Sequence, residues 1–136
     1  MSNIEQTLSI IKPDAVERNL ENDIKKIFID KQFKIIKEKK IQIEKSEAEK
    51  FYKVHETKPF YSDLCDYLSS GPFVVMILEK ENAVLSNREL MGATNPKDAV
   101  DGTIRKKYGI SIDKNSVHGS DSLENAKIEI DFFFKA

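Results

Sequence analysis

The sequence contains a single cysteine, Cys65, in 136 residues. One thiol cannot form an internal disulfide, so a secreted scaffold stapled by disulfides is excluded and a reducing cytoplasm is expected. Cys65 falls between Leu64 and Leu68 in a predicted helix. We therefore interpret it as a buried thiol rather than as a nucleophile.

Long apolar runs and an excess of one charge are also absent. The longest apolar run, Phe73–Leu78, is far shorter than the roughly 20 residues that cross a bilayer. Residues 1–6 lack the apolar stretch of a secretory signal. The formal net charge is −1 and no basic, aromatic-studded surface is evident, so neither a membrane nor a nucleic acid is expected as the main partner.

Familiar phosphate and metal motifs are missing as well. The sequence has no Gly-x-x-x-x-Gly-Lys-Ser/Thr loop, no Gly-x-Gly-x-x-Gly turn and no Cys/His cluster with zinc spacing. A bound anion would have to be held by separate cations and backbone amides. Only two histidines, His55 and His118, are available for histidine chemistry.

The residues that are present predict one domain over residues 1–136. The composition, 40% apolar and 33% charged, is typical of a globular protein, and no repeat or linker divides the chain. Apolar periodicity predicts strands at 7–11, 34–43, 73–78 and 117–119, and helices at 20–28, 46–55, 60–68, 82–91 and 122–134. Strands separated by paired helices favour an α+β ferredoxin-like sandwich, with a four-stranded antiparallel sheet covered by helices.

Three local patterns add detail to this fold. Ile35, Ile41 and Ile43 are predicted to share one face of a strand whose other side is wet. Residues 46–49, Ser-Glu-Ala-Glu, have the form of a capping box that begins a helix. The segment 92–115 has no strong period apart from a possible helical turn near 103–108, and long loops in compact domains are usually functional.

The densest polar segment surrounds His118. Residues 115–122 read Asn-Ser-Val-His-Gly-Ser-Asp-Ser and precede the last predicted helix. An imidazole at a helix N-terminus is a nucleophile beside amide donors and a dipole that favours anions, and near neutral pH it carries a free lone pair. The alternative is a surface histidine beside a helix cap.

Glu129 is the predicted partner of this imidazole. It lies on one helical row with Ser122, Ala126 and Phe133, so its carboxylate can point back toward the start of the helix. A carboxylate there would accept the N–H of one ring nitrogen and leave the other free to attack. The alternative is a solvated glutamate. Ile128 and Phe132 lie on the opposite side of the helix, which hints at burial against another subunit.

Several cations stand at positions that favour anion binding. Arg88 shares a helical row with apolar residues, Arg105 lies in the glycine-bearing segment and Lys12 ends a strand. Taken singly, each is better explained as a surface charge or as a side chain whose apolar stem packs on the protein. Together with Thr94 and Asn115 they would form the positive cage that a phosphoryl transition state requires.

Four segments resemble the signatures of nucleoside diphosphate kinases, in the family's order and spacing. They are residues 7–14 (TLSIIKPD), 88–96 (RELMGATNP), 102–105 (GTIR) and 115–122 (NSVHGSDS). Shorter matches occur at 51–55, 58–60 and 70–72, so the resemblance runs from about residue 5 to residue 134. It implies a ping-pong mechanism in which His118 takes the γ-phosphate of a triphosphate, becomes a phosphohistidine and passes the group to a diphosphate.

The resemblance also implies a role for each remaining residue of the site. Glu129 would hold the imidazole, with Ser120 and Tyr52 close by. Lys12 and Asn115 would engage the sugar hydroxyls, and Lys12 could also stabilise the transferring charge. The residues expected to contact the phosphates are Arg88, Thr94, Arg105 and His55, and those expected to flank the base are Phe60 and Ile112.

The same resemblance implies the ligands and the assembly. Stacking on a ring is indifferent to base identity, so nucleoside di- and triphosphates of every base are expected to bind. Mg²⁺ would arrive with the nucleotide phosphates, without a dedicated protein site. A homo-oligomer, tetramer or hexamer, is expected, and the short C-terminus favours a bacterial-type enzyme.

The chain departs from the family pattern where members often have glycine. These positions, near 22–23, at 32 and at 80, lie outside the proposed site and affect turn geometry. An inactive relative that serves as a nucleotide-binding or scaffolding module is the alternative reading. Loss of the histidine or of a cage cation would favour that alternative, but every one of these residues is present.

Overall fold

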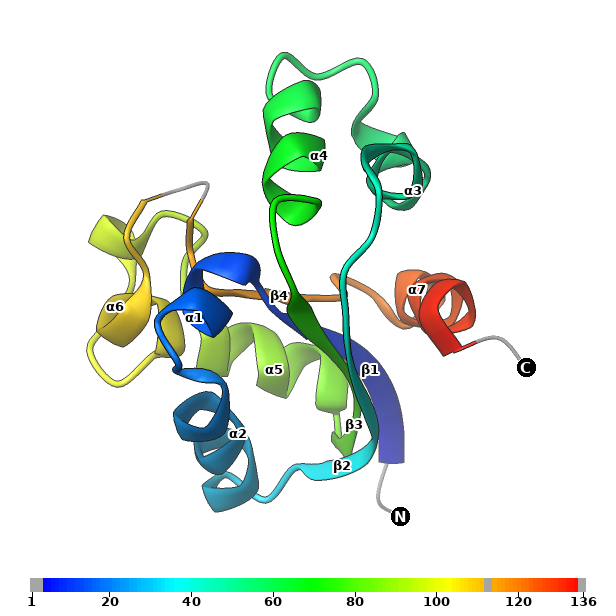
Figure 1. Ribbon diagram of the computed structural model, residues 1–136. Coiled ribbons are helices and arrows are strands. Elements are labelled where there is room, and N and C mark those ends of the chain that lie inside the picture. Colours follow the sequence, from blue (N-terminus) through cyan, green and yellow to red (C-terminus); the bar gives the residue numbers. More distant parts are fainter. Residues whose placement is uncertain (1–3, 112–113, 135–136) are drawn as a thin grey trace.

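The computed structural model describes residues 4–111 and 114–134 (Figure 1). The strands are β1 Ile4–Ile11, β2 Lys34–Ile41, β3 Phe73–Glu81 and β4 Val117–Gly119. The α-helices are α1 Pro13–Glu17, α2 Glu21–Asp30, α3 Lys45–Phe51, α4 Tyr61–Leu68, α5 Ala83–Met91, α6 Ile104–Tyr108 and α7 Leu123–Phe134. Two short 3₁₀ helices, η1 Lys53–His55 and η2 Pro96–Asp98, follow α3 and α5.

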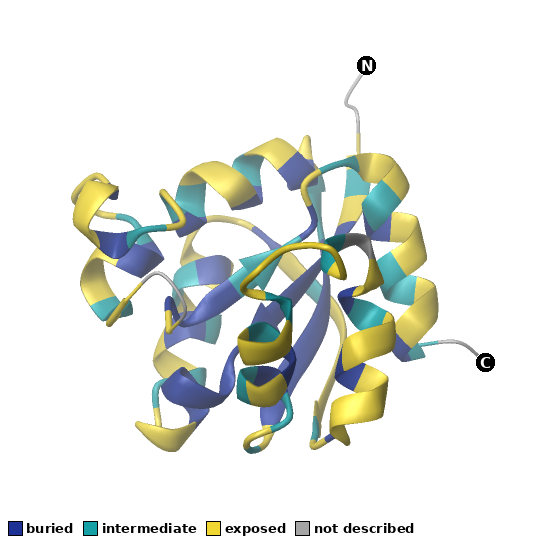
Figure 2. Cartoon of the chain, turned by 90° about the horizontal axis from the view of Figure 1, so that it is seen from above, coloured by how far each residue is buried: buried dark blue, intermediate teal, exposed yellow. Residues whose placement is uncertain are grey.

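The four strands form one sheet in the order β2-β3-β1-β4, and every neighbouring pair is antiparallel. Helices lie on both faces, with α1, α2 and α5 on one side and α3, α4 and α7 on the other (Figure 1). Viewed from above, the central strands β1 and β3 are mostly buried, whereas the helices turn exposed residues outward (Figure 2). The edge strand β2 is largely exposed. The predicted ferredoxin-like α+β sandwich is confirmed. Within the described ranges, no helix combines the length and apolarity that crossing a bilayer requires.

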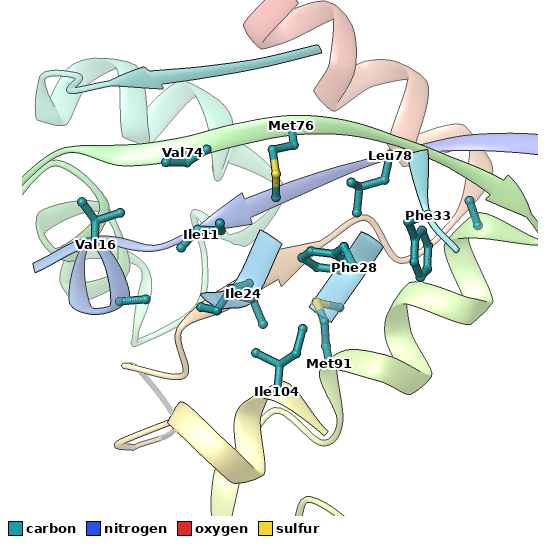
Figure 3. Packing of buried hydrophobic residues seen from close by; sticks show 13 residues of the cluster. Ile11, Val16, Ile24, Phe28, Phe33, Val74, Met76, Leu78, Met91 and Ile104 are labelled. Atoms are coloured by element: carbon teal, nitrogen blue, oxygen red, sulfur yellow. The ribbon is translucent and has the colours of Figure 1, made fainter. Parts of the chain in front are cut away.

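Two apolar clusters fill the spaces between the sheet and its helices. The α2-side core comprises Ile11, Ala15, Val16, Ile24, Phe28, Phe33, Val74, Met76, Leu78, Ala83, Met91, Ile104 and Val117 (Figure 3). The α7-side core comprises Leu8, Ile10, Ile43, Ala48, Tyr52, Cys65, Leu68, Phe73, Val75 and Phe133. Alternate side chains of β3 pack into the two cores, so residues 73–78 are all buried. It is the doubly covered central strand that its apolar run predicts.

The predicted common face of Ile35, Ile41 and Ile43 is wrong. Ile35 packs against the α2-side core, whereas Ile41 and Ile43 belong with the α7-side core. The pairing of β2 with β3 shifts register between Ile35 and Lys37, which places one extra residue, Ile36, in the edge strand. An extra residue reverses the alternation of all later side chains, so the two ends of β2 face opposite sides of the sheet.

The predicted helix starts are partly corrected. Helix α3 begins at Lys45 with Glu44 as its N-cap, not at Ser46, and the Glu44 N–H donates to Glu47 Oε1 at 3.5 Å. Helix α7 begins as predicted after Ser122, whose Oγ accepts from the Asn125 N–H at 3.1 Å. This second cap sets the direction in which α7 leaves the segment that contains His118.

Phe28 tests the packing of the α2-side core. Its ring is fully buried and meets Phe33 edge-to-face, with centroids 5.6 Å apart. We expect Phe28→Ala to lower the free energy of unfolding by about 3–5 kcal/mol, because the lost ring leaves a cavity. Denaturant titration measures this change. Ile29→Ala, on the exposed side of the same helix, is the control and should change stability by less than about 0.5 kcal/mol. Equal losses in the two variants would contradict this packing.

Candidate active site

His118 lies at the centre of β4, an edge strand that pairs with β1. Its register partner is Ile10, and the preceding residue, Val117, is fully buried in the α2-side core. Because side chains alternate along a strand, the imidazole points to the opposite side, toward α7. There its ring meets Phe51 nearly edge-on, with centroids 5.6 Å apart and an interplanar angle of 75°. About a fifth of the side chain, 22%, is exposed, so the ring is supported by packing and still open to a ligand.

Glu129 holds one nitrogen of this imidazole. His118 Nε2 lies 3.1 Å from Glu129 Oε1, and Ser120 Oγ donates to the same oxygen at 2.7 Å. An ionised carboxylate only accepts hydrogen bonds, so this contact favours the tautomer with its proton on Nε2. The lone pair then lies on Nδ1.

Gly119 brings α5 close to the imidazole. A Cβ at this position would collide with the side-chain amide of Asn87 and lie 2.7 Å from Met91 Cε. A larger residue would have to displace these two side chains, so glycine favours the close packing of β4 against α5. Arg88 follows Asn87 on this helix, is exposed and borders a surface hollow together with Asp121.

Arg105 is a buried cation directly behind β4. Its Nη1 donates to the Gly92 carbonyl and its Nη2 to the Val117 carbonyl, each at 2.9 Å, while Nε has no hydrogen-bond partner within the described part of the chain. Burial, together with the nearby charge of Arg88, lowers the pKa of Arg105 to about 10. The guanidinium is still charged at neutral pH, and it is anchored one residue before His118.

Lys12 and Asn115 form a second polar pair. Lys12 follows the end of β1 and is the N-cap of α1, with Pro13 at the first helical position. Its Nζ donates to Asn115 Oδ1 at 2.9 Å, and Asn115 Nδ2 donates to the Thr94 carbonyl at 3.0 Å. Lys12 and Asn115 are buried whereas Thr94 is exposed, so the chain of contacts leads from the interior to the surface.

Three aromatic rings lead outward from the α7-side core. Tyr52 is buried, and its ring centroid lies 6.3 Å from that of His55, which lies 5.8 Å from that of Phe60. Burial raises the pKa of Tyr52, and the Glu129 carboxylate adds to the rise, so the phenol stays protonated. Phe60 is 44% exposed and offers its ring to solvent. Ile112, the predicted residue across from it, lies outside the described residues.

Sequence reasoning missed five residues that surround these groups. Phe51 packs on the imidazole. It stands in the matched segment 51–55, but the resemblance assigned it no role. The other four, Asp14, Arg18, Tyr67 and Ser116, are joined by hydrogen bonds beneath Lys12 and Asn115. Asp14 and Ser116 stand inside segments that resemble the family's signatures, so the resemblance could have pointed to them. Arg18 and Tyr67 lie outside every such segment.

No group of three or more acidic, histidine or cysteine side chains that could hold a metal ion occurs among the residues the structure covers. The side chains gathered here are an imidazole, amides, hydroxyls and cations. Cations and amides bind phosphate oxygens, and a free imidazole nitrogen can accept a phosphoryl group.

Comparison with known proteins places this geometry in context. The family described as nucleoside diphosphate kinase matches residues 5–136. A protein named nucleoside diphosphate kinase from Campylobacter jejuni is 58% identical over 132 residues, covering 97% of this chain and 96% of that protein. The protein of the same name from Wolinella succinogenes is 58% identical over 131 residues, covering 96% of each.

Comparison of the backbone with solved structures gives the same family. The crystal structure of the Aquifex aeolicus nucleoside diphosphate kinase has a TM-score of 0.96 to this structure at 38% identity, and the match covers 98% of this chain and 96% of that chain. Sequence and backbone agree along nearly the entire length, and the chain belongs to the nucleoside diphosphate kinase family.

Proposed function

We propose that this chain transfers the γ-phosphate of a nucleoside triphosphate to a nucleoside diphosphate through a phosphohistidine on His118. The Nδ1 lone pair forms a bond to the γ-phosphorus while the bond from that phosphorus to the bridging oxygen breaks. The electron pair leaves with the first nucleoside diphosphate. A terminal oxygen of a second diphosphate then attacks the phosphorus, and the N–P bond breaks to restore the lone pair.

The contact of His118 Nε2 with Glu129 is the observation that carries this proposal. It fixes the ring orientation and directs the proton to Nε2. It also supports the positive charge that a phosphorylated imidazole develops, because the carboxylate lies against the nitrogen that keeps its proton. Ser120 donates to the same carboxylate oxygen and limits its movement. Tyr52, buried and protonated near Glu129, adds to this support.

The phosphates would be held by the cations around the imidazole. Arg105, Arg88 and Lys12 supply the positive charge that a loose, charge-spread transition state needs, and Thr94 and His55 supply further contacts. Arg105 is already fixed by two backbone carbonyls. Little reorganisation is then required when the transition state forms.

The nucleoside would lie between the aromatic rings and the polar pair. Phe60, exposed beyond His55, supports stacking of the base, with Ile112 on its other side. Lys12 and Asn115 would bind the sugar hydroxyls. Stacking does not distinguish one base from another, so purine and pyrimidine nucleotides, ribo and deoxy, should all be substrates.

Mg²⁺ enters this proposal as part of the substrate. The cationic character of the donor set fits phosphate oxygens rather than a metal, so the ion would be held by the nucleotide phosphates themselves. Bound there, it neutralises charge on the β- and γ-phosphates during transfer.

The wider setting is proposed on the same basis. One domain over residues 1–136 is supported by the family match, which spans residues 5–136. A homo-oligomer, tetramer or hexamer, is supported by Ile128 and Phe132 on α7, which expose 61% and 39% of their surface.

We propose a cytoplasmic location for the enzyme, because nucleotides and reduced thiols occur there. Because His118 and the cations are present, an inactive scaffolding role is not favoured.

The phosphohistidine itself can be detected. Incubation with γ-labelled triphosphate should leave label on the protein that is stable in alkali and lost in acid. His118→Asn should abolish both labelling and turnover and leave the circular dichroism spectrum unchanged. His55→Asn is the control, because it removes the other histidine; it should still be labelled, at a lower rate. Label on the His118 variant would refute the proposed nucleophile.

Arg105 tests the positive cage. We expect Arg105→Ala to slow turnover by about 10²–10³-fold, because a preorganised charge beside the transferring group is lost. Stopped-time assays at saturating nucleotide measure the rate. Lys106→Ala, which removes the next, exposed cation of α6, should change it less than about twofold. A near-normal rate in the Arg105 variant would remove this residue from the cage.

Phe60 tests the binding of the base. Phe60→Ala should raise the KM for nucleoside diphosphates by about tenfold or more, since stacking on one aromatic ring contributes about 1–3 kcal/mol. The increase should be similar for purine and pyrimidine acceptors, and Ile29→Ala should leave both values unchanged. An increase confined to one base would show that Phe60 reads base identity.

A further inference from the structure

Asp14 has a buried carboxylate that the proposed chemistry does not use. Its side chain is 4% exposed and accepts hydrogen bonds from Arg18 Nη2 at 3.0 Å, from Ser116 Oγ at 3.0 Å and from the Tyr67 hydroxyl. The Asp14 N–H in turn donates to the Tyr67 oxygen at 2.9 Å. A buried carboxylate needs such donors, because an unpaired charge inside a protein is costly.

Tyr67 is the donor in its bond with Asp14. Burial raises the pKa of Tyr67, and its hydrogen bond with the Asp14 carboxylate adds to the rise, so the phenol keeps its proton. The residue belongs to α4, the helix that begins directly after Phe60. The bond therefore joins α4 to the first turn of α1.

Ser116 joins the same carboxylate to the segment that precedes β4. It has a positive φ of 74°, and the Val117 N–H donates to the Asn115 carbonyl at 2.9 Å, which makes a tight turn centred on Ser116. Such turns are strained for residues other than glycine and persist only where neighbouring contacts hold them. The Lys12 N–H donates to the Ser116 carbonyl at 2.8 Å and supplies one such contact.

Arg18 connects a fourth segment. Besides Asp14, its Nη2 donates to Ser116 Oγ at 3.1 Å and to the Tyr108 carbonyl at 2.7 Å. Tyr108 ends α6, the helix that contains Arg105. Each segment that meets at Asp14 therefore contains or adjoins a residue to which we assign a nucleotide contact.

We propose that Asp14 is a positioning residue, whose bonds to Ser116, Tyr67 and Arg18 hold Lys12 and Asn115 in the arrangement that binds the nucleotide sugar. This inference rests on the proposed function. Ser116 directly follows Asn115, and Asp14 lies two residues after Lys12. The bond between Ser116 and Asp14 therefore joins the same two segments as the bond between Lys12 Nζ and Asn115 Oδ1. Loss of the Tyr67 hydroxyl leaves Asp14 Oδ1 without its donor, and loss of the Ser116 hydroxyl leaves Oδ2 with Arg18 alone. In either case the buried carboxylate is less well satisfied, and the flanking turn shifts to compensate.

Tyr67→Phe is the direct test, because it removes only the hydroxyl. Its matched control is Tyr61→Phe in the same helix, whose hydroxyl donates instead to the Glu49 carbonyl at 2.9 Å, within the α3–α4 pair. Ser116→Ala removes a different donor to Asp14 and is the second variant. For each protein we would measure kcat/KM with a ribonucleoside diphosphate and with its 2′,3′-dideoxy counterpart as phosphate acceptor.

We expect Tyr67→Phe and Ser116→Ala to lower kcat/KM about tenfold with the ribonucleotide and less than about threefold with the dideoxynucleotide. The dideoxy acceptor has no hydroxyls for Lys12 and Asn115 to bind, so their displacement costs it less. Tyr61→Phe should change neither value by more than about twofold.

Equal losses with both acceptors would overturn the proposal, because a general loss of structure does not depend on sugar hydroxyls. Unchanged values with both acceptors in both variants would overturn it as well. Failure of the proposed function would be detected by a separate experiment. In that case the wild-type protein would take no label from γ-labelled triphosphate.

Discussion

The hydrogen bond between His118 Nε2 and Glu129 is the interaction on which the site depends. It forms only because β4 pairs with β1 and α7 packs on the sheet through Ala126 and Phe133, which are buried. The cap at Ser122 then directs the helix so that Glu129 faces the strand it follows. The α7-side core and the helix cap thus serve one purpose, which is to fix a carboxylate against one ring nitrogen and leave the other available.

Around this bond, the site is organised in advance of any ligand. Arg105 is tied to two carbonyls, one of them in the residue before His118, and Lys12 is paired with Asn115. Burial of these groups costs solvation, as the lowered pKa of Arg105 reflects. That cost is met by hydrogen bonds made when the chain folds, so the positive charges need not be gathered during phosphoryl transfer. Membership of the nucleoside diphosphate kinase family agrees with such a site.

The sequence predicted the features that short segments encode. The continuous apolar run of residues 73–78 identifies β3, and the helical spacing of Glu129 from Ser122 already turned its carboxylate toward His118. The register shift near Ile36 could not be foreseen, because it depends on how β2 pairs with β3. The bond between Tyr67 and Asp14 joins residues 53 positions apart, and neither residue's local pattern indicates the other. Contacts between distant segments, rather than the elements themselves, are what the sequence left open.

The identity of the attacking nitrogen is the most direct test of this description. Phosphorus–nitrogen NMR coupling in protein whose histidines are enriched in ¹⁵N, recorded after reaction with a nucleoside triphosphate, shows which ring nitrogen carries the phosphate. With Nε2 held by Glu129, we expect the phosphorus to couple to Nδ1 of His118. Coupling to Nε2, or to a nitrogen of His55, would contradict the central role of the His118–Glu129 bond.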